Sequence, residues 1–140
     1  MSFVLHKRLA ADTVPVAELA LCSARLMNDS RWPWLILVPR RAEAVELHAL
    51  DDADQVLLVR EIALASRVLE TVHKPAKINV GALGNLVPQL HVHVIARNRD
   101  DPAWPGPVWG AGTPVPYGDA LAPTVARLRT ALDRAGPQPG

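Results

Sequence analysis

The sequence has little cysteine and no excess of charge of one sign. Its single cysteine, Cys22, excludes an internal disulfide and a zinc site built from cysteines, and we expect it to be a small core residue. Fifteen Lys and Arg residues oppose fourteen Asp and Glu residues, which leaves a formal net charge of +1. This balance lacks the basic excess typical of proteins that bind nucleic-acid polymers or membrane surfaces. An anionic ligand would therefore have to be bound by a local group of residues.

Long apolar runs and internal repeats are also absent from the sequence. No apolar run approaches the roughly 20 residues that span a bilayer. Residues 2–10 carry charges where a secretory signal peptide would need an apolar core. We therefore expect a cytoplasmic protein. The 140 residues, 49% of them hydrophobic, predict a single domain over residues 1–140 that is large enough to bury a core.

Several segments predict β-strands. The apolar run 34–38 lies between two prolines and predicts a short strand buried on both faces. Residues 77–83 and 89–97 predict two antiparallel strands joined as a hairpin by a Gly-containing connection. Residues 19–27 fit either a strand or a helix, and the polar residues that follow predict a turn.

Two segments predict helices. Apolar residues recur near the helical period over residues 51–73, with Asp51 as the N-cap. A final amphipathic helix is predicted over residues 123–135, with a proline in its first turn. Between them, residues 101–118 contain five prolines and four glycines and predict an irregular crossing segment. The combination predicts an α+β domain.

The most informative stretch is residues 89–95, Gln-Leu-His-Val-His-Val-Ile. Side chains alternate between the two faces of a strand, so Gln89, His91 and His93 are expected to share one face. The apolar residues between them are expected to share the other face: Leu90, Val92 and Val94. One face is therefore apolar, and the other carries groups with chemistry.

Alternative interpretations of the two histidines stay open on this pattern alone. They fit half-buried structural histidines, an exposed polar face, or part of a metal site. A catalytic zinc normally needs a third protein ligand, and the remaining histidines lie far away in the sequence. Those remaining histidines are expected to be surface or cap residues: His6, His48 and His73.

The residues before the histidines favour a phosphate site. Asn79 lies in the preceding predicted strand, and Gly81, Gly84 and Asn85 follow it. Backbone N–H groups and small amides of such a loop can bind a phosphate. A neutral imidazole beside that loop is a good nucleophile toward phosphorus, and its other ring nitrogen can donate to a backbone carbonyl.

These residues resemble the histidine triad (HIT) superfamily of nucleotide hydrolases and transferases. Residues 89–95 are similar to its signature, in which three histidines alternate with apolar residues, in six of seven positions. The stretches INVGALGNLVP, residues 78–88, and WLILVPRR, residues 34–41, resemble the strand and loop before the signature and an earlier strand of the family. The resemblance implies an antiparallel sheet of about five strands with two main helices, and a homodimer.

The resemblance also implies roles for individual residues. His91 would be the nucleophile that forms a covalent nucleotidyl-histidine, and His93 would support the site around the phosphate. The remaining positions would contact phosphate or ribose: Asn28, Asp29, Asn79, Gly84 and Asn85. The implied ligand is a small nucleotide, with no cofactor and no metal ion held permanently by the protein, although a divalent ion can arrive with a polyphosphate substrate.

Two positions depart from the family pattern. Gln89 stands where the first histidine of the triad would be, and Trp34 falls near a position that carries a further histidine in many members. Gln can donate and accept hydrogen bonds but cannot carry a proton near neutral pH. The predicted function is hydrolysis or transfer at the α-phosphate of a dinucleoside polyphosphate, a nucleoside phosphoramidate or a related nucleotide. The alternative is a catalytically weak nucleotide-binding or interaction protein on the same fold.

The remaining basic and aromatic residues have plainer expected roles. The pairs Arg40–Arg41 and Arg97–Arg99 could meet a phosphate, but solvated side chains are the expectation for both. Trp104 and Trp109 are expected to pack over the sheet or against a partner subunit, with stacking on a base as the alternative.

Overall fold

The structure is a computed structural model that describes residues 2–136. Its five strands form one antiparallel sheet in the order β1-β2-β3-β5-β4. The strands are β1 (Thr13–Glu18), β2 (Cys22–Met27), β3 (Trp34–Pro39), β4 (Lys77–Gly81) and β5 (Val92–Arg97). The helices are α1 (Lys7–Asp12), α2 (Asp52–His73) and α3 (Leu121–Ala135), with short 3-10 turns η1 (Leu47–Ala49) and η2 (Gly118–Ala120). The predicted α+β class, with five antiparallel strands and two main helices, is confirmed.

The long helix α2 begins after the predicted N-cap and ends at the predicted residue. The Asp51 side chain accepts a hydrogen bond from the backbone N–H of Asp54, which satisfies one of the unpaired donors at the helix start. At the other end, Lys74 adopts a left-handed conformation with φ of 49°, and its N–H donates to the Glu70 carbonyl. The final predicted helix is confirmed as α3, which starts two residues earlier than predicted.

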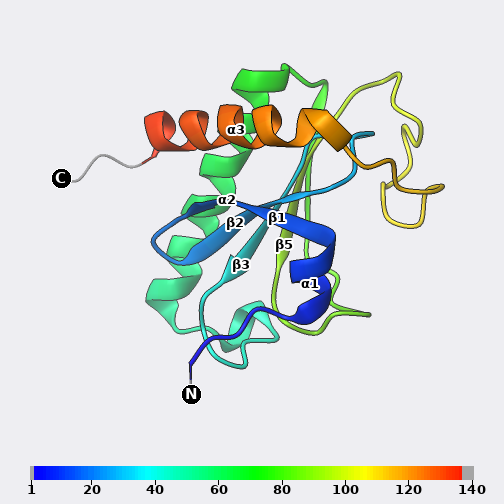
Figure 1. Cartoon of the computed structure of the whole chain (residues 1–140). Helices are drawn as coiled ribbons and strands as arrows, with labels where there is room; N and C mark the ends of the chain where they lie inside the picture. Colours follow the sequence, from blue (N-terminus) through cyan, green and yellow to red (C-terminus); the bar gives the residue numbers. More distant parts are fainter. Residues whose placement is uncertain (1, 137–140) are drawn as a thin grey trace.

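Both faces of the sheet are covered, and they are covered differently (Figure 1). Helices α2 and α3 pack on one face, where Leu35 and Leu37 of β3 and Val94 of β5 belong to the larger apolar core. The opposite face carries Trp34 and Ile36, which belong to a second core that also includes residues of α1 and of the crossing segment 101–118. All six residues of β3 are buried, as predicted for the run 34–38.

Parts of the sheet differ from the sequence-based expectation. Residues 22–27 form a strand, which decides between the two interpretations of residues 19–27. The predicted hairpin pairing is confirmed, but β5 begins only at Val92, so Gln89 and His91 precede the regular ladder. Strand β1 and helix α1 were not predicted. The crossing segment 101–118 is irregular, as expected.

More of the arginine side chains form hydrogen bonds to other protein groups than we predicted. Arg97 was expected to be solvated, and this is wrong: it is only 1% exposed and donates to Asp101, Asn79 and the Gly106 carbonyl. Burial of its guanidinium is tolerated because these acceptors satisfy its donors. Arg99, by contrast, is exposed as predicted.

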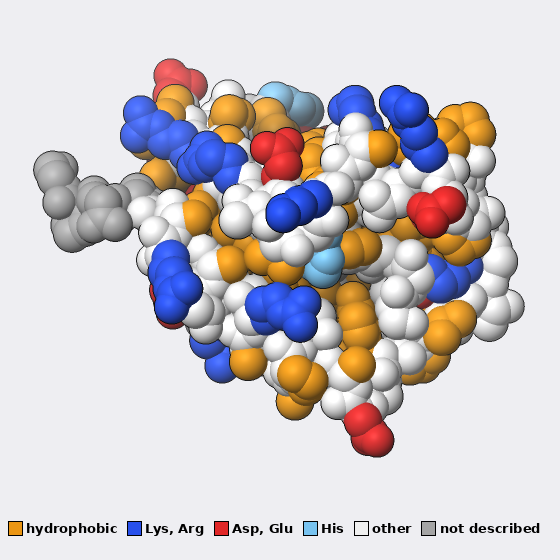
Figure 2. Space-filling view, turned by 90° about the horizontal axis from the view of Figure 1, so that it is seen from above, with side chains coloured by type: hydrophobic (Ala, Val, Ile, Leu, Met, Phe, Trp, Pro, Cys, Tyr) orange, Lys and Arg blue, Asp and Glu red, His pale blue; other side chains and the backbone are white. Residues whose placement is uncertain are grey.

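The other arginine pair also contacts protein groups. Arg40 donates to Glu18 and to the Leu19 carbonyl, and Arg41 forms a two-bond ion pair with Asp54. On the face seen in Figure 2, the Lys and Arg side chains of the described residues are dispersed among apolar and acidic ones rather than gathered in one patch. Within residues 2–136, none of the helices combines the length and the apolar character needed to cross a membrane.

The single cysteine lies in the core, as expected. The three histidines outside residues 89–95 agree in part with their expected surface or cap positions. Cys22 is buried in the larger core, and this burial raises the pKa of its thiol. His6 caps α1 by accepting from the Arg8 N–H, and His48 is exposed. His73 is half-buried at the end of α2, where desolvation lowers the pKa of its imidazole.

Candidate functional site

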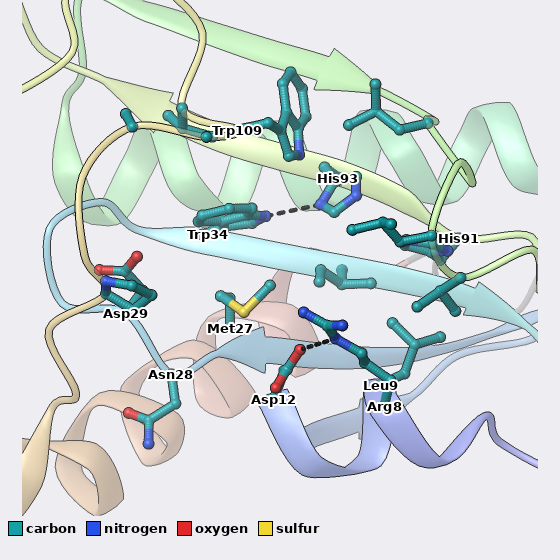
Figure 3. Close-up of a pocket in the computed structure, with 18 of the residues that line it drawn as sticks. Arg8, Leu9, Asp12, Met27, Asn28, Asp29, Trp34, His91, His93 and Trp109 are labelled. Carbon is teal, nitrogen blue, oxygen red and sulfur yellow. Dashed lines mark hydrogen bonds and ion pairs between the residues drawn. The ribbon is translucent and has the colours of Figure 1, made fainter.

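A cavity of about 580 Å³ lies on the sheet face that carries Trp34 and Ile36 (Figure 3). Its floor is formed by β3, β5 and the end of β2, and α1 forms one wall. The loop 83–87 and the end of the crossing segment, residues 108–114, form the other walls. Its volume is within the range typical of small-molecule sites. His91 and His93 both line it, 4.9 Å apart between ring centroids.

The ring of His91 is oriented by a backbone carbonyl two residues earlier in the sequence. Its Nδ1 lies 2.7 Å from the carbonyl oxygen of Gln89. A carbonyl can only accept a hydrogen bond, so Nδ1 of His91 carries the proton and donates it. In the neutral ring, Nε2 then holds a lone pair. His91 is therefore fixed in the tautomer that a nucleophile or base at Nε2 requires.

His93 has the opposite tautomer. The indole nitrogen of Trp34 lies 3.0 Å from Nδ1 of His93, and an indole N–H can only donate. Nδ1 of His93 must therefore accept, and the neutral ring carries its proton on Nε2. Burial, together with the neighbouring His91, lowers the pKa of His93 from 6.5 to about 4. At neutral pH, His93 is thus an uncharged donor at Nε2.

Trp109 closes the other side of His93. The two rings meet edge to face at 5.2 Å between centroids. The indole also lies against Gly81, where a Cβ atom would come within 3.0 Å of its ring carbon Cη2. Gly81 therefore permits the close approach of Trp109 to the sheet. The prediction that Trp109 packs over the sheet is confirmed by these contacts.

The predicted phosphate loop lies beside the histidines. Gly84 and Asn85 line the cavity together with His91 and His93. Gly84 has a φ of 72°, in the left-handed region that glycine adopts without steric cost. The turn that this conformation allows brings the loop 83–87 over the cavity. Of the predicted phosphate-binding residues before β5, Gly84 and Asn85 thus line the same cavity as the two imidazoles.

Asn28 and Asp29 also lie in the cavity wall, but both already have partners. The Asn28 side chain accepts from the Tyr117 N–H. Asp29 is 2% exposed and accepts from the Arg31 side chain at 3.0 and 2.8 Å and from the Val115 N–H. Burial alone would raise the pKa of Asp29, but the hydrogen bonds from Arg31 and Val115 lower it below the ordinary value. Asp29 therefore holds the crossing segment in place.

Two of the predicted site residues lie outside this cavity. Asn79 does not line this cavity, and its Oδ1 accepts from Arg97 at 2.8 Å. Gln89 lines a neighbouring cavity of about 260 Å³, which His91 and Gly84 also line. In this structure Asn79 thus satisfies a buried guanidinium, and Gln89 does not line the main cavity with the two histidines.

Helix α1 contributes wall residues that the sequence did not reveal. Arg8, Leu9 and Asp12 line the cavity, and the Arg8 guanidinium extends from α1 into it (Figure 3). The helix has only six residues, too few for a periodic pattern. The spacing of Arg8 and Asp12, which form an ion pair at 3.4 Å, was the only local signal of a helix there.

The described residues 2–136 contain no group of three or more His, Cys, Asp or Glu side chains placed to hold a metal ion. The site is therefore built from two imidazoles with opposite hydrogen bonding at Nδ1, a glycine-containing loop and a cavity large enough for a small ligand.

The fold and the two imidazoles define the class of protein. The chain matches the HIT domain family over residues 8–100 and therefore belongs to the histidine triad family. It is similar over most of its length to solved histidine triad proteins, whereas no curated protein matched it.

Three of these structures cover nearly the whole chain. The histidine triad protein of Bradyrhizobium japonicum is 44% identical, with a TM-score of 0.91, over 94% of this chain and 99% of that one. The Marinobacter aquaeolei protein is 46% identical, with a TM-score of 0.93, over 97% and 100%. The Sinorhizobium meliloti protein is 49% identical, with a TM-score of 0.89, over 92% and 96%. Because each covers nearly the whole chain, the sheet, the helices and the crossing segment all belong to the shared fold.

Proposed function

We propose that the protein is a nucleotide hydrolase or nucleotidyl transferase that acts at the α-phosphate of a dinucleoside polyphosphate, a nucleoside phosphoramidate or a related nucleotide. The observation that carries this proposal is the opposite hydrogen bonding of the two imidazoles at one wall of the cavity. Nδ1 of His91 contacts an acceptor, and Nδ1 of His93 contacts a donor. One ring offers a lone pair at Nε2, and the other offers a proton there. In a substitution at phosphorus, the lone pair can attack and the donor can stabilise the phosphate oxygens.

The reaction would proceed in two steps. In the first, Nε2 of His91 attacks the α-phosphorus while the bond to the leaving group breaks in line, and the leaving group departs with the bonding electrons and takes a proton from solvent. In the second, water attacks the same phosphorus and gives up a proton to solvent, the bonding electrons of the phosphorus–nitrogen bond return to Nε2 of His91, and the nucleoside monophosphate is released. A different acceptor in place of water would make the reaction a transfer.

His93 would support both steps without changing its charge. Its Nε2–H can donate to a phosphate oxygen whose negative charge grows in the transition state. Because its Nδ1 accepts from Trp34 and its pKa lies near 4, it keeps this donor role over the neutral pH range. The backbone of the loop at Gly84 and the Asn85 side chain would be further contacts of the phosphate, because both residues line the cavity with the histidines. Asn28, at the cavity wall, is the candidate for ribose contacts.

The alternative function is nucleotide binding without appreciable turnover. It is favoured by one observation: Gln89, at the first triad position, faces a different cavity and donates its amide to a backbone carbonyl. No group that titrates near neutral pH therefore stands at that position. The two functions differ in one measurable property, the release of monophosphate from a bound nucleotide.

We also propose that the protein is a cytoplasmic homodimer of single-domain subunits, as the family resemblance implies. Apolar side chains remain exposed along the edge strand β4 and the loop that follows it: Val80 at 49%, Leu83 at 48% and Leu86 at 81%. An edge strand with exposed apolar side chains is a surface that proteins normally cover.

The proposed function is tested by a panel of nucleotides. Each compound is first screened for an increase in Tm, because a ligand that binds the folded state stabilises it. Each compound that binds is then assayed for release of nucleoside monophosphate. We expect binding and release for at least one dinucleoside polyphosphate or phosphoramidate. Binding without release would favour the alternative, and no binding across a broad panel would contradict both.

A further inference from the structure

The side chain of Gln89 is hydrogen-bonded to the backbone of two residues near the N-terminus, Val4 and His6. Its Oε1 accepts from the His6 N–H at 2.8 Å, and its Nε2 donates to the Val4 carbonyl at 2.8 Å. Both polar ends of the amide are thus paired with backbone groups more than 80 residues away in the sequence. We call residues 3–12, which include α1, the N-terminal arm. Gln89 fixes this arm at the residue that begins its helix.

The N-terminal arm is placed over the cavity by this contact and by packing. Three apolar side chains of the arm, Phe3, Leu5 and Leu9, pack in the second core. His6, whose backbone Gln89 holds, accepts at Nδ1 from the Arg8 N–H and so caps α1. The position of α1 therefore depends on Gln89 through one intervening residue. Helix α1 in turn carries Arg8 into the cavity wall.

Arg8 is the available cation of the cavity. The other arginine in the wall, Arg31, is committed to Asp29 and to the Ala111 carbonyl. Arg8 donates through Nε to Asp12 at 3.4 Å, and within residues 2–136 its two terminal nitrogens have no partner. Both side chains of this pair are exposed, at 60% and 47%, so the pair contributes little to stability and is easily exchanged for another partner.

We propose that Arg8 binds a phosphate group of the nucleotide held at His91, and that Gln89 is the positioning residue that keeps Arg8 there. A guanidinium pairs with phosphate through two parallel hydrogen bonds, and the terminal nitrogens of Arg8 are available for them. The identity of the ligand rests on the proposed function, but the role of Gln89 does not. In this protein the residue at the first triad position has a structural role: the Gln89 side chain positions the N-terminal arm, which forms part of the cavity wall, and does not exchange protons.

The first measurement needs no ligand. Hydrogen exchange at the His6 amide is compared between the wild type and Gln89→Leu, which keeps a side chain of similar size without its polar groups. We expect at least a tenfold loss of protection at His6 and in α1, with the exchange of the β3 amides unchanged. Unchanged exchange at His6 would overturn the role of Gln89, whatever the protein binds.

The second measurement uses calorimetric titration with AMP, GMP and the matching nucleosides. Arg8→Gln should weaken binding of the monophosphates about tenfold or more and leave nucleoside affinity unchanged, since hydrogen bonds to charged groups are the stronger ones. Lys7→Gln is the matched control: it removes the same charge from the adjacent exposed residue, which lines neither cavity. Equal effects of Arg8→Gln and Lys7→Gln would overturn the role of Arg8.

The double variant tests whether the two residues act together. If Gln89 acts through Arg8, Gln89→Leu should weaken monophosphate binding in the wild type but add little to Arg8→Gln. Arg8→Lys should recover part of the affinity, because a point charge remains. Additive losses would overturn the coupling. If the wild type binds no nucleotide of the broad panel, both the proposed function and the phosphate role of Arg8 are contradicted. The role of Gln89 is then still decided by the hydrogen-exchange measurement. Binding of panel nucleotides with no effect of Arg8→Gln would overturn the role of Arg8 alone.

Discussion

Trp34 donates its indole N–H to Nδ1 of His93 at 3.0 Å, from β3 to the neighbouring strand β5. Both side chains are nearly buried, at 6% and 5% exposure, so water does not compete effectively for this bond. The contact explains what Trp34 does at the position where many members of the family carry a further histidine. Where a further histidine would be another titratable group, Trp34 is a permanent donor that keeps the proton of His93 on Nε2.

Trp34→Phe should release His93 from this constraint. The ring then loses the donor that favours its neutral form, so its pKa should rise and the second tautomer should become populated. Because fewer molecules then present a neutral Nε2–H donor, we expect kcat to fall about tenfold with a small change in KM. Nitrogen-15 NMR of the imidazole ring reports the tautomer directly.

Trp109→Phe is the control for this variant. Trp109 also packs edge to face on His93, but within the described residues its indole nitrogen has no hydrogen-bond partner. The tautomer of His93 should therefore stay unchanged. If both variants shifted the NMR signals of His93 equally, packing rather than the hydrogen bond would set the tautomer.

The lowered pKa of His93 should appear in the pH dependence of stability. Between pH 6.5 and about 4, the unfolded chain binds a proton at His93 that the folded protein does not bind. The free energy of unfolding should therefore fall as the pH is lowered through this range, by on the order of 3 kcal/mol from this residue. Above pH 6.5 the contribution is constant.

This prediction is measured by urea unfolding at several pH values for the wild type and His93→Gln. Gln accepts a hydrogen bond from Trp34 but does not titrate, so the variant should lose this part of the slope. Parallel stability curves for the two proteins would show that His93 is readily protonated in the folded state.

Arg97 and Arg99 provide a matched pair for the buried ionic network. Arg97→Ala leaves Asp101 and Asn79 without their partner in the interior, and breaking such a network typically costs about 3–5 kcal/mol. Arg99→Ala removes an exposed side chain and should change stability by less than about 0.5 kcal/mol. Urea unfolding distinguishes the two, and equal effects would contradict the structural role of Arg97.

The proposed homodimer should be stable at micromolar concentration. Light scattering should give twice the mass of the 15.2 kDa chain. Leu86→Asp, in the exposed apolar surface after β4, should shift the equilibrium toward the monomer, because the charge would have to lose its water. A wild type that is monomeric throughout this range would rule the homodimer out.

The elements predicted from the sequence were those with strong local signals. The capped helix α2, the run of β3 between prolines and the alternating pattern of β5 needed no knowledge of their neighbours. Helix α1 and strand β1 were missed because α1 has six residues and β1 contains a proline, so neither shows a clear period.

Residues whose contacts depend on the tertiary fold could not be assigned correctly. Nothing around Arg97 indicates that three acceptors will surround it, and nothing around Gln89 indicates that Val4 and His6 will pair with it. His91 and His93 were placed on one wall by strand alternation, but their opposite tautomers depend on Trp34 and on a carbonyl. Such contacts are products of the tertiary fold.

The central claim is that Nε2 of His91 is a nucleophile toward phosphorus. His91→Ala should abolish turnover by several orders of magnitude and leave nucleotide affinity nearly unchanged, because the lost bond forms only during the reaction. His93→Gln should have a milder effect, since it would lose a supporting donor and not the reacting atom.

The most direct measurement is rapid quenching of the wild type with a substrate labelled at the α-phosphate. We predict a covalent adduct on the protein that is stable to base and labile to acid, as expected for a phosphorus–nitrogen bond, and that is absent from His91→Ala. Full turnover of the same substrate by His91→Ala, or turnover by the wild type with label found on another residue, would contradict the account.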